Sequence, residues 1–392
     1  MRFPEFSGEW KEEQLDSIAT LSKGIGISKE QLSEDGEPCI LYGELYTKYK
    51  SEIIKHVESK TDIDSSKLKR SKANDVIIPC SGETAVDIAT ARCVPFDNIL
   101  LGGDLNVISL HKYDGAFMSY QLNGKRKYDI ARVAQGVSVV HLYGEHLKAI
   151  KTYNPSLPEQ QKIAKLLSLI DERIATQNKI IEKLQSLIKG LNDNIHKGIK
   201  GETVCFSDLG EAYSGLSGKG GDDFGYGEPF ITYMNVYQNT YISEKDYELV
   251  QIAPNEKQNS VQYGDALFTL SSETPEEVGI GAVYLGNTQK LYLNSFCFGI
   301  HFYDERVLPQ YLAHFISSSS FRRAIYPLAQ GSTRFNLQKN DFMKMKFLLP
   351  SLEKQGHIAN TLDALHCRLA NEKSLTEQYI LLKKYLLSLM FI

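Results

Sequence analysis

The most regular pattern of hydrophobic positions lies in the middle of the chain. Apolar residues recur there at spacings of three and four, and only Gln177 interrupts them. This stripe comprises Ile163, Leu167, Ile170, Ile174, Ile181, Leu184, Ile188, Leu191 and Ile195. A heptad pattern of this length predicts a long helix that needs a partner helix along most of its length. Ser156 as the N-cap, Pro158 in the first turn and Glu159 as the acid of a capping box predict where the helix begins.

A second copy of this helix opening occurs near the end of the chain. The phrase "NPSLPEQQKIAKLLSLIDERI" from Asn154 aligns without a gap, at an offset of 195, with "LPSLEKQGHIANTLDALHCRL" from Leu349. The second stripe contains Ile358, Leu362, Leu365 and Leu369 and then, after a slip in register, Leu375, Tyr379, Leu382, Leu386 and Leu389. A helix of about 40 residues is roughly 60 Å long, too long to fold back into a domain of this size. We therefore expect the two helices to pair with each other as an antiparallel coiled coil.

The duplication extends upstream of both helices. Three further phrases occur twice: "AQG" at Ala134 and Ala329, "GEPCILYGELY" from Gly36 and "GEPFITYMNVY" from Gly227, and "SGETAVDIATA" from Ser81 and "SSETPEEVGIGA" from Ser271. The chain therefore reads as two copies of one unit, each a globular part followed by a long helix. The expected boundaries are 1–153 and 201–348 for the globular parts, and 154–200 and 349–392 for the helices.

The globular parts are predicted to be mixed α/β (α+β) with many short strands. Runs such as "NDVIIPCSG", "GDALFTLSS", "GAVYLG" and "NSFCFGIHFY" are rich in β-branched or aromatic residues and are bounded by Gly, Asn or Asp, as short strands are. Helices are expected in "KYKSEIIKHVESK", residues 48–60, and in "PQYLAHFISSSSFRRAI", residues 309–325.

Composition narrows the class of protein. A chain of 392 residues, 42% hydrophobic and 23% charged, is long enough for two domains with their own cores. No basic leader precedes an apolar run, and no segment approaches the roughly 18 apolar residues of a membrane span, so a cytoplasmic protein without a membrane partner is expected. The six cysteines form no C-x-x-C pair, so neither a disulfide framework nor a metal site is expected. The net charge of -4 argues against an indiscriminate nucleic-acid coat but leaves local basic patches open.

The order of these segments resembles the specificity subunit of type I restriction-modification systems over essentially the whole chain. The most specific part is the opening "PSLPEQQKIA" of the first helix and "PSLEKQGHIA" of the second, supported by "AQG" and a following Leu142 or Leu337. The second copy departs from the pattern, with Lys354 and Gly356 in place of Glu159 and Gln161. The resemblance implies two target recognition domains that each read half of a split, asymmetric site in double-stranded DNA, with the coiled coil setting the spacer. It also implies two copies of a DNA adenine methyltransferase subunit as partners, with motor-nuclease subunits as further members of some complexes.

Basic residues in the two globular parts are the candidates for contact with DNA. They are Lys67, Lys69, Arg70 and Lys72 in "KLKRSK", Lys125, Arg126, Lys127 and Arg132 in "NGKRKYDIAR", Lys219 in "SGLSGKGG", the pair Arg322 and Arg323, and Arg334 in "GSTRFNL". Lys and Arg neutralise phosphates, and Arg also reads base edges in the major groove. The simpler interpretation of any one of them is a solvated surface residue.

Catalytic and cofactor motifs are missing from the sequence. "NPSL" at Asn154 lacks the second proline and the aromatic residue of the adenine methyltransferase motif that it superficially resembles. "KGIGISKE" and "SGLSGKGG" lack the spacing of nucleotide-binding loops, and the nine histidines show no metal-ligand pattern. We therefore expect a non-catalytic subunit without a cofactor. Two alternatives remain open: a two-headed adaptor that binds ligands other than DNA, and an enzyme with an unrecognised active site.

Overall fold

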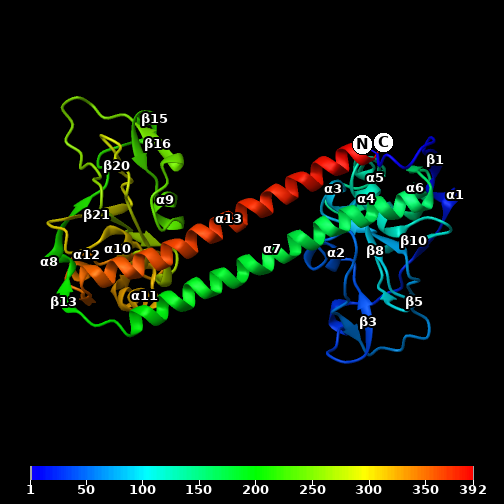
Figure 1. Cartoon of the computed structure of the whole chain (residues 1–392), viewed down its shortest axis with the longest axis horizontal. Coiled ribbons are helices and arrows are strands. Elements are labelled where there is room, and N and C mark those ends of the chain that lie inside the picture. The colour runs from blue at the N-terminus through cyan, green and yellow to red at the C-terminus, as the bar shows by residue number, and fades with distance from the viewer. Residues whose placement is uncertain (1, 392) are drawn as a thin grey trace. The chain divides into compact units, whose positions relative to one another are not determined.

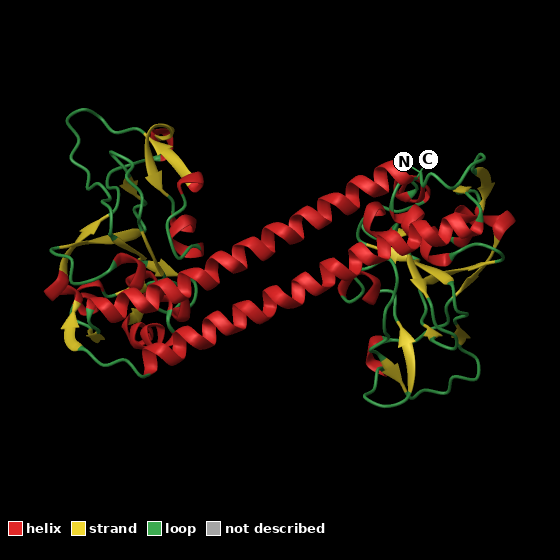
Figure 2. Ribbon diagram, in the orientation of Figure 1, coloured by secondary structure: helices red, strands yellow, loops and turns green. Residues whose placement is uncertain are grey.

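The computed structural model describes residues 2–391, which form two compact units (Figure 1). Unit 1 consists of residues 2–179 and 373–391, and unit 2 consists of residues 180–372. Two long helices, α7 (Leu157–Lys197) and α13 (Leu352–Met390), each contribute one part to each unit. Short strands and helices make up the globular parts (Figure 2), so the predicted mixed fold with two long helices is confirmed.

A four-stranded antiparallel sheet in the order β2-β10-β6-β8 forms the centre of unit 1. Its strands are β2 (Ala19–Lys23), β6 (Asp75–Pro79), β8 (Arg92–Val94) and β10 (Leu105–Leu110), and helix α4 (Gly115–Asn123) packs on one face. Val76 and Ile78 of β6 belong to the same hydrophobic core as α4, whereas Ile77 packs with Leu105 and Val107 on the opposite face. Because both faces are covered, all of β6 is buried, which explains its unbroken apolar run.

Smaller elements surround this sheet. The other strands of unit 1 are β1 (Lys11–Gln14), β3 (Glu37–Ile40), β4 (Lys60–Thr61), β5 (Lys69–Arg70), β7 (Ser81–Gly82), β9 (Leu100–Leu101), β11 (Val140–His141) and β12 (Lys151–Asn154). Its short helices are α1 (Leu15–Ile18), α2 (Glu44–Thr47), α3 (Ala85–Ile88), α5 (Lys127–Val133) and α6 (Gly144–Lys148). The helix predicted over residues 48–60 is wrong. Helix α2 ends at Thr47, and the Ile54 amide donates to the Cys93 carbonyl at 3.0 Å, so this segment is held extended beside β8.

Unit 2 repeats the central sheet of unit 1. Its order is β14-β21-β17-β19, again with antiparallel neighbours. These strands are β14 (Gly210–Ser214), β17 (Ala266–Thr269), β19 (Gly281–Val283) and β21 (Cys297–Phe302). The core of unit 2 is more aromatic: the rings of Phe206 and Phe342 stack with centroids 5.0 Å apart, and Phe268 and Phe298 pack beside them. The duplication seen in the sequence is therefore also a duplication of strand order.

The other strands of unit 2 are β13 (Glu202–Cys205), β15 (Phe224–Ile231), β16 (Tyr247–Val250), β18 (Ser271–Ser272), β20 (Tyr292–Leu293), β22 (Ala329–Gln330), β23 (Phe335–Leu337) and β24 (Lys346–Leu349). Its short helices are α8 (Phe206–Leu209), α9 (Tyr233–Gln238), α10 (Pro309–Ser317), α11 (Ser319–Ile325) and α12 (Lys339–Met343). The helical stretch predicted over 309–325 is thus present as α10 and α11. It is broken at Ser318, whose hydroxyl caps α11 by accepting from the Phe321 amide.

Each long helix is fastened to its globular part by the glutamine of the repeated opening. Gln160 is 1% exposed: its amide nitrogen donates to the Pro155 carbonyl at 2.8 Å, and its side-chain oxygen accepts from the Asp114 amide at 2.9 Å. Gln355, with no exposed surface, repeats this arrangement with the Pro350 carbonyl and the Leu308 amide. The repetition of this glutamine therefore has a structural cause, because a buried amide needs partners for both ends.

The acid of the predicted capping box has a different role. Glu159 does not complete the box, because both oxygens of its buried carboxylate accept from the guanidinium of Arg2 at 2.7 Å. In α13, the Ser351 hydroxyl accepts from the Lys354 amide at 3.4 Å, as expected of an N-cap.

The two helices run in opposite directions within each unit. In unit 1, Ile163 and Leu167 near the start of α7 share a core with Leu386 and Met390 near the end of α13. In unit 2, Ile358 and Leu362 near the start of α13 share a core against which Leu191 and Ile195, near the end of α7, pack. The helices are therefore paired antiparallel at both ends, as predicted.

The predicted register slip in α13 is wrong. From Leu369 the spacing of three and four continues without interruption through positions 372, 376, 379, 383, 386 and 390. Thr376 is 7% exposed and the Lys383 side chain 14%, whereas Leu382 is 43% exposed and lies away from the seam. The slip was inferred because polar residues, Glu372, Thr376 and Lys383, occupy three seam positions, so that counting only apolar residues shifts the stripe by one residue. Leu375 and Leu389, each 37% exposed, also lie away from the seam on the same helix face as Leu382. The remaining predicted seam residues are buried or half-buried, as the stripe requires. Among residues 2–391, no helix combines the length and the hydropathy that crossing a bilayer requires.

Candidate nucleic-acid interface

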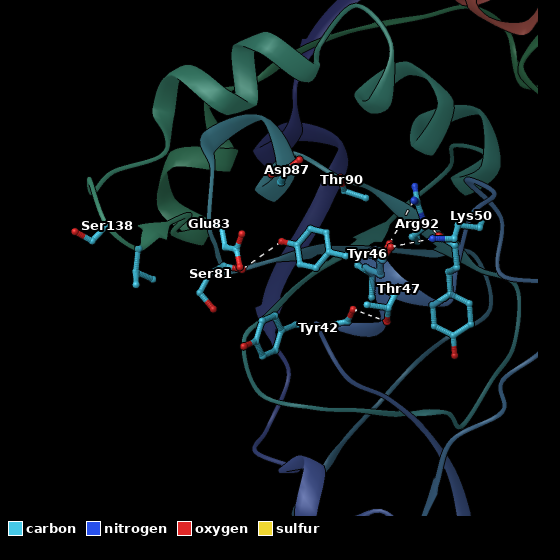
Figure 3. Close-up of a pocket in the computed structure, with 15 residues that line it drawn as sticks. Tyr42, Tyr46, Thr47, Lys50, Ser81, Glu83, Asp87, Thr90, Arg92 and Ser138 are labelled. Carbon is cyan, nitrogen blue, oxygen red and sulfur yellow. Dashed lines mark hydrogen bonds between the residues drawn. The ribbon is translucent and has the colours of Figure 1, made fainter. Parts of the chain in front are cut away.

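Three of the repeated sequence segments meet around one pocket in unit 1. The pocket has a volume of about 720 Å³, and its lining includes Tyr42 and Tyr46 from the α2 segment and Glu83 and Asp87 from the β7–α3 segment. Ser138 and Val139, which follow the "AQG" motif, form another wall. Figure 3 shows these walls arranged around an open space. Segments far apart in the sequence are thus brought together at one site.

The corresponding segments of unit 2 line a second pocket, with a volume of about 470 Å³. The equivalent lining pairs, unit 1 first, are Tyr42 and Tyr233, Gly43 and Met234, Tyr46 and Tyr237, Ser81 and Ser271, Gly82 and Ser272, Glu83 and Glu273, Asp87 and Glu277, Ser138 and Thr333, and Val139 and Arg334. Phe296 adds a further aromatic wall in unit 2. A pocket built twice from the same three segments is the clearest local feature that the duplication has retained.

A short β-ladder holds the loop after "AQG" against each pocket. In unit 1, β11 pairs with β7 so that Val140 lies opposite Gly82. In unit 2, β23 pairs with β18 so that Phe335 lies opposite Ser272, which is the same register. The loop preceding β11 or β23 is therefore placed identically in the two units.

The glycine of "AQG" makes this loop possible. Gly136 and Gly331 have φ angles of +118° and +145°, in the region that favours glycine. A Cβ atom on Gly136 would lie 2.2 Å from the carbonyl oxygen of Val139, and one on Gly331 would lie 2.1 Å from that of Arg334. The glycine thus lets the chain fold tightly enough to place the residue three positions later at the pocket.

Hydrogen bonds fix the shared side chains. In unit 1, the Tyr46 hydroxyl donates to the Ser81 carbonyl at 3.2 Å (Figure 3). In unit 2, the Tyr237 hydroxyl donates to Glu277 at 2.7 Å, and the Ser272 hydroxyl donates to the other oxygen of that carboxylate at 3.1 Å. These bonds lower the pKa of Glu277, so the carboxylate is ionised at neutral pH. Each pocket therefore offers a hydrogen-bonded tyrosine beside a carboxylate.

The comparison with known protein families decides what kind of protein carries these paired pockets. The model of the type I restriction modification DNA specificity domain matches twice, over residues 7–186 and 201–378. The chain belongs to this family. Specificity subunits are the non-catalytic DNA-recognition components of type I restriction-modification systems. The resemblance seen in the sequence is thereby confirmed.

Individual relatives agree with the family assignment. The chain is 22% identical over 344 residues to the type I restriction enzyme MjaVIII specificity subunit of Methanocaldococcus jannaschii, covering 81% of this chain and 78% of that protein. The crystal structure of a type I restriction-modification S subunit from M. genitalium matches with a TM-score of 0.58 and 14% identity, over 100% of this chain and 99% of that one. A chain from a study of complex assembly and conformational transition of the type I R-M system matches with a TM-score of 0.61 and 15% identity, over 98% and 97% of the two chains. At these identities the structural matches establish a shared fold.

Several basic residues proposed from the sequence of this specificity subunit are held by internal partners. Arg70 forms two bonds with Glu37, at 2.6 and 3.0 Å, which lower the pKa of Glu37 to about 2. The Lys219 side chain is 8% exposed and pairs with Glu256 at 2.5 Å. Arg322 donates to three backbone carbonyls of residues 276–279 and so braces the loop that carries Glu277. These contacts give Arg70, Lys219 and Arg322 structural roles in the specificity subunit.

Most of the remaining candidates lie near the surface, but the Arg126 side chain is only 17% exposed. Arg126 and Arg132 both pair with Asp129 at 3.2 Å. Lys67, Lys72, Lys125 and Arg323 are exposed, and Lys69 and Lys127 are half-exposed. Arg334 is exposed and is the only one of the twelve predicted residues that lines either pocket. The basic clusters of the sequence are therefore not gathered at one site.

The pocket residues that the two units of this specificity subunit share were missed because they are not basic. The tyrosines, serines and carboxylates that line both pockets lie in the repeated phrases, which in the sequence alone indicate a duplication and not a site. The signal that could have found them was the repetition of "Y-x-x-x-Y" from Tyr42 and Tyr233 and of "S-x-E-T" from Ser81 and Ser271.

Proposed function

We propose that this chain directs a type I complex to an asymmetric, two-part DNA sequence, and that each unit reads one part. The observation that carries the proposal is the pocket that occurs in both units in the same frame but with a different lining. The two pockets share their backbone arrangement, as expected of two modules that bind the same kind of ligand. Their lining side chains differ, as expected of modules that read two different half-sites. No specific observation favours a two-headed adaptor for other ligands.

We infer that the paired helices set the number of unread base pairs between the two half-sites. Both α7 and α13 extend from one unit into the other. A long helix lengthens by about 1.5 Å per residue, so the number of residues in this connection fixes how far apart the two half-sites lie. The complete site is then bipartite with a gap of constant length.

The partner that acts on the DNA is proposed to be a DNA adenine methyltransferase, in two copies, joined in some complexes by motor-nuclease subunits. Part of α13 in unit 1 presents an apolar face beside the seam, made of Leu375, Leu381, Leu382, Tyr385 and Leu389, which are 37% to 63% exposed. Exposed leucines spaced along one helix face are typical of a protein interface. We place one methyltransferase contact here. The complex would act in the cytoplasm, where the DNA of the cell is accessible.

In vitro selection tests this function. The chain is purified together with the type I methyltransferase subunit of its host, and the complex is used to select DNA from a random duplex library. The enriched sequences should share two different blocks separated by a constant gap. The proposal is contradicted if the complex enriches a single block, or enriches the same sequences as the methyltransferase without this chain.

A further inference from the structure

The paired pockets allow shared positions to be separated from variable ones. The tyrosine pair, the first serine and the following glutamate are the same in both pockets, and Asp87 is matched by the carboxylate of Glu277. Two differences are large: Gly43 corresponds to Met234, and Val139 corresponds to Arg334. The second pair lies in loops that have the same glycine turn and the same ladder register. The backbone thus presents chemically different side chains at the same place.

We propose that the residue three positions after the "AQG" glycine is a specificity-determining residue in each unit: Arg334 selects a guanine in one half-site, and Val139 makes no such selection in the other. This inference rests on the proposed function, because it assigns bases to residues of a DNA reader. The proposed base contact lies in the half-site of unit 2, and the other bases of both half-sites are left to the remaining residues of each unit.

Arg334 is available for such a contact. Its side chain is exposed, and among residues 2–391 no carboxylate forms an ion pair with it. The guanidinium lies 5.3 Å from the centroid of the Phe296 ring, which is itself 52% exposed. A cation–π contact of this kind limits the orientations of the guanidinium but leaves its N–H donors unpaired. By contrast, the donors of Arg322 are used by backbone carbonyls.

The chemistry of the two side chains gives the predicted selectivity. A guanidinium donates two hydrogen bonds to O6 and N7 of guanine in the major groove, and no other base offers two acceptors there. The Val139 side chain is 54% exposed and has no donor, so it offers a base edge only apolar contact. The half-site read by unit 2 should therefore contain a guanine that depends on Arg334.

The selection experiment described above, repeated with variants in complex with the methyltransferase, tests this inference. Arg334→Val should reduce the preference for guanine at one position of one half-site by about 5- to 150-fold, the range of one bidentate contact. The other positions, the gap and the other half-site should be unchanged. Arg323→Val is the matched control: Arg323 is exposed on α11 outside the pocket lining, so its loss can lower affinity only uniformly and should leave the preference for guanine unchanged.

The reciprocal variant, in unit 1, gives a second test that does not depend on the result for Arg334→Val. Val139→Arg should introduce a guanine preference into the half-site read by unit 1 and leave the half-site of unit 2 unchanged. An Arg334→Val complex that selects the original site with uniformly lower affinity would overturn the inference, because it would show a phosphate contact. If the unaltered complex selects no two-part site, the proposed function itself fails; if it does and Arg334→Val selects the same site, only this inference fails.

Discussion

Replacing Lys383 by methionine should lower the free energy of unfolding of unit 1 by about 3–5 kcal/mol, the usual cost of leaving a buried charge without its partner. The Lys383 ammonium lies 2.5 Å from Glu52 and 2.6 Å from Asp171. The three side chains are 14%, 10% and 7% exposed. Tyr120 donates a further bond to Asp171 at 2.6 Å. Without the lysine, two carboxylates would face each other in a buried site.

The effect of Lys383→Met should also depend on pH. Burial raises the pKa of Glu52 above its usual value even with Lys383 present, and removing the ammonium raises it further. At a pH between the ordinary glutamate pKa and the raised one, the folded variant keeps a proton on Glu52 that the unfolded variant has lost. The free energy of unfolding of the variant therefore falls as the pH rises through this window. The difference in free energy of unfolding between Lys383→Met and the unaltered chain should therefore be larger at pH 7 than at pH 5.

Chemical unfolding at the two pH values measures this effect. Lys384→Met is the matched control, because the neighbouring lysine is exposed, and its stability should stay within about 0.5 kcal/mol of the unaltered chain. Glu52→Gln added to Lys383→Met should recover part of the loss by removing one of the two charges. A loss below about 1 kcal/mol for Lys383→Met would show that this charge cluster does not fasten α13 to unit 1.

Insertion of one heptad into both long helices should lengthen the gap between the half-sites and leave the half-sites themselves unchanged. The insertion points are after Lys179 in α7 and after Glu372 in α13, where each helix passes from one unit to the other. Seven residues add about 10.5 Å, which corresponds to up to about three base pairs at roughly 3.4 Å per pair. The heptad keeps the seam in register, because its length matches the period of the stripe.

The altered gap is read from the DNA that the modified complex selects or methylates. Inserting the heptad into α7 alone is the control: α13 cannot then follow, the seam is mismatched, and two-part recognition should be lost. An unchanged gap after insertion into both helices would show that something other than helix length sets the spacing.

The long helices could be predicted from the sequence because heptad spacing and the duplicated opening depend on local patterns. Their seam could not be predicted completely, because the place of Lys383 is decided by Glu52, a residue 331 positions away in the sequence. The same reason explains the failed helix prediction at 48–60, where pairing with Cys93 overrides a local helical pattern. A distant partner also explains why Lys219 is not a surface lysine: its side chain is buried in an ion pair with Glu256.

The candidate site was the least predictable part. Basic residues were sought because DNA is acidic, yet the feature retained in both units is a pocket of tyrosines, serines and carboxylates. Only Arg334 belongs both to the basic candidates and to a pocket. The repeated phrases were visible in the sequence. Their meeting around one pocket was not, because it depends on the pairing of β7 with β11 and of β18 with β23.

The proposed role of this chain is to give a methyltransferase its two-part target. Single-molecule sequencing of methylated adenine in the host genome, with the gene intact and with it deleted, tests this claim most directly. Deletion should abolish methylation at one motif, made of two different half-sites with a fixed gap, and leave every other methylated motif unchanged. A methylome that still contains every such two-part motif after deletion would contradict it.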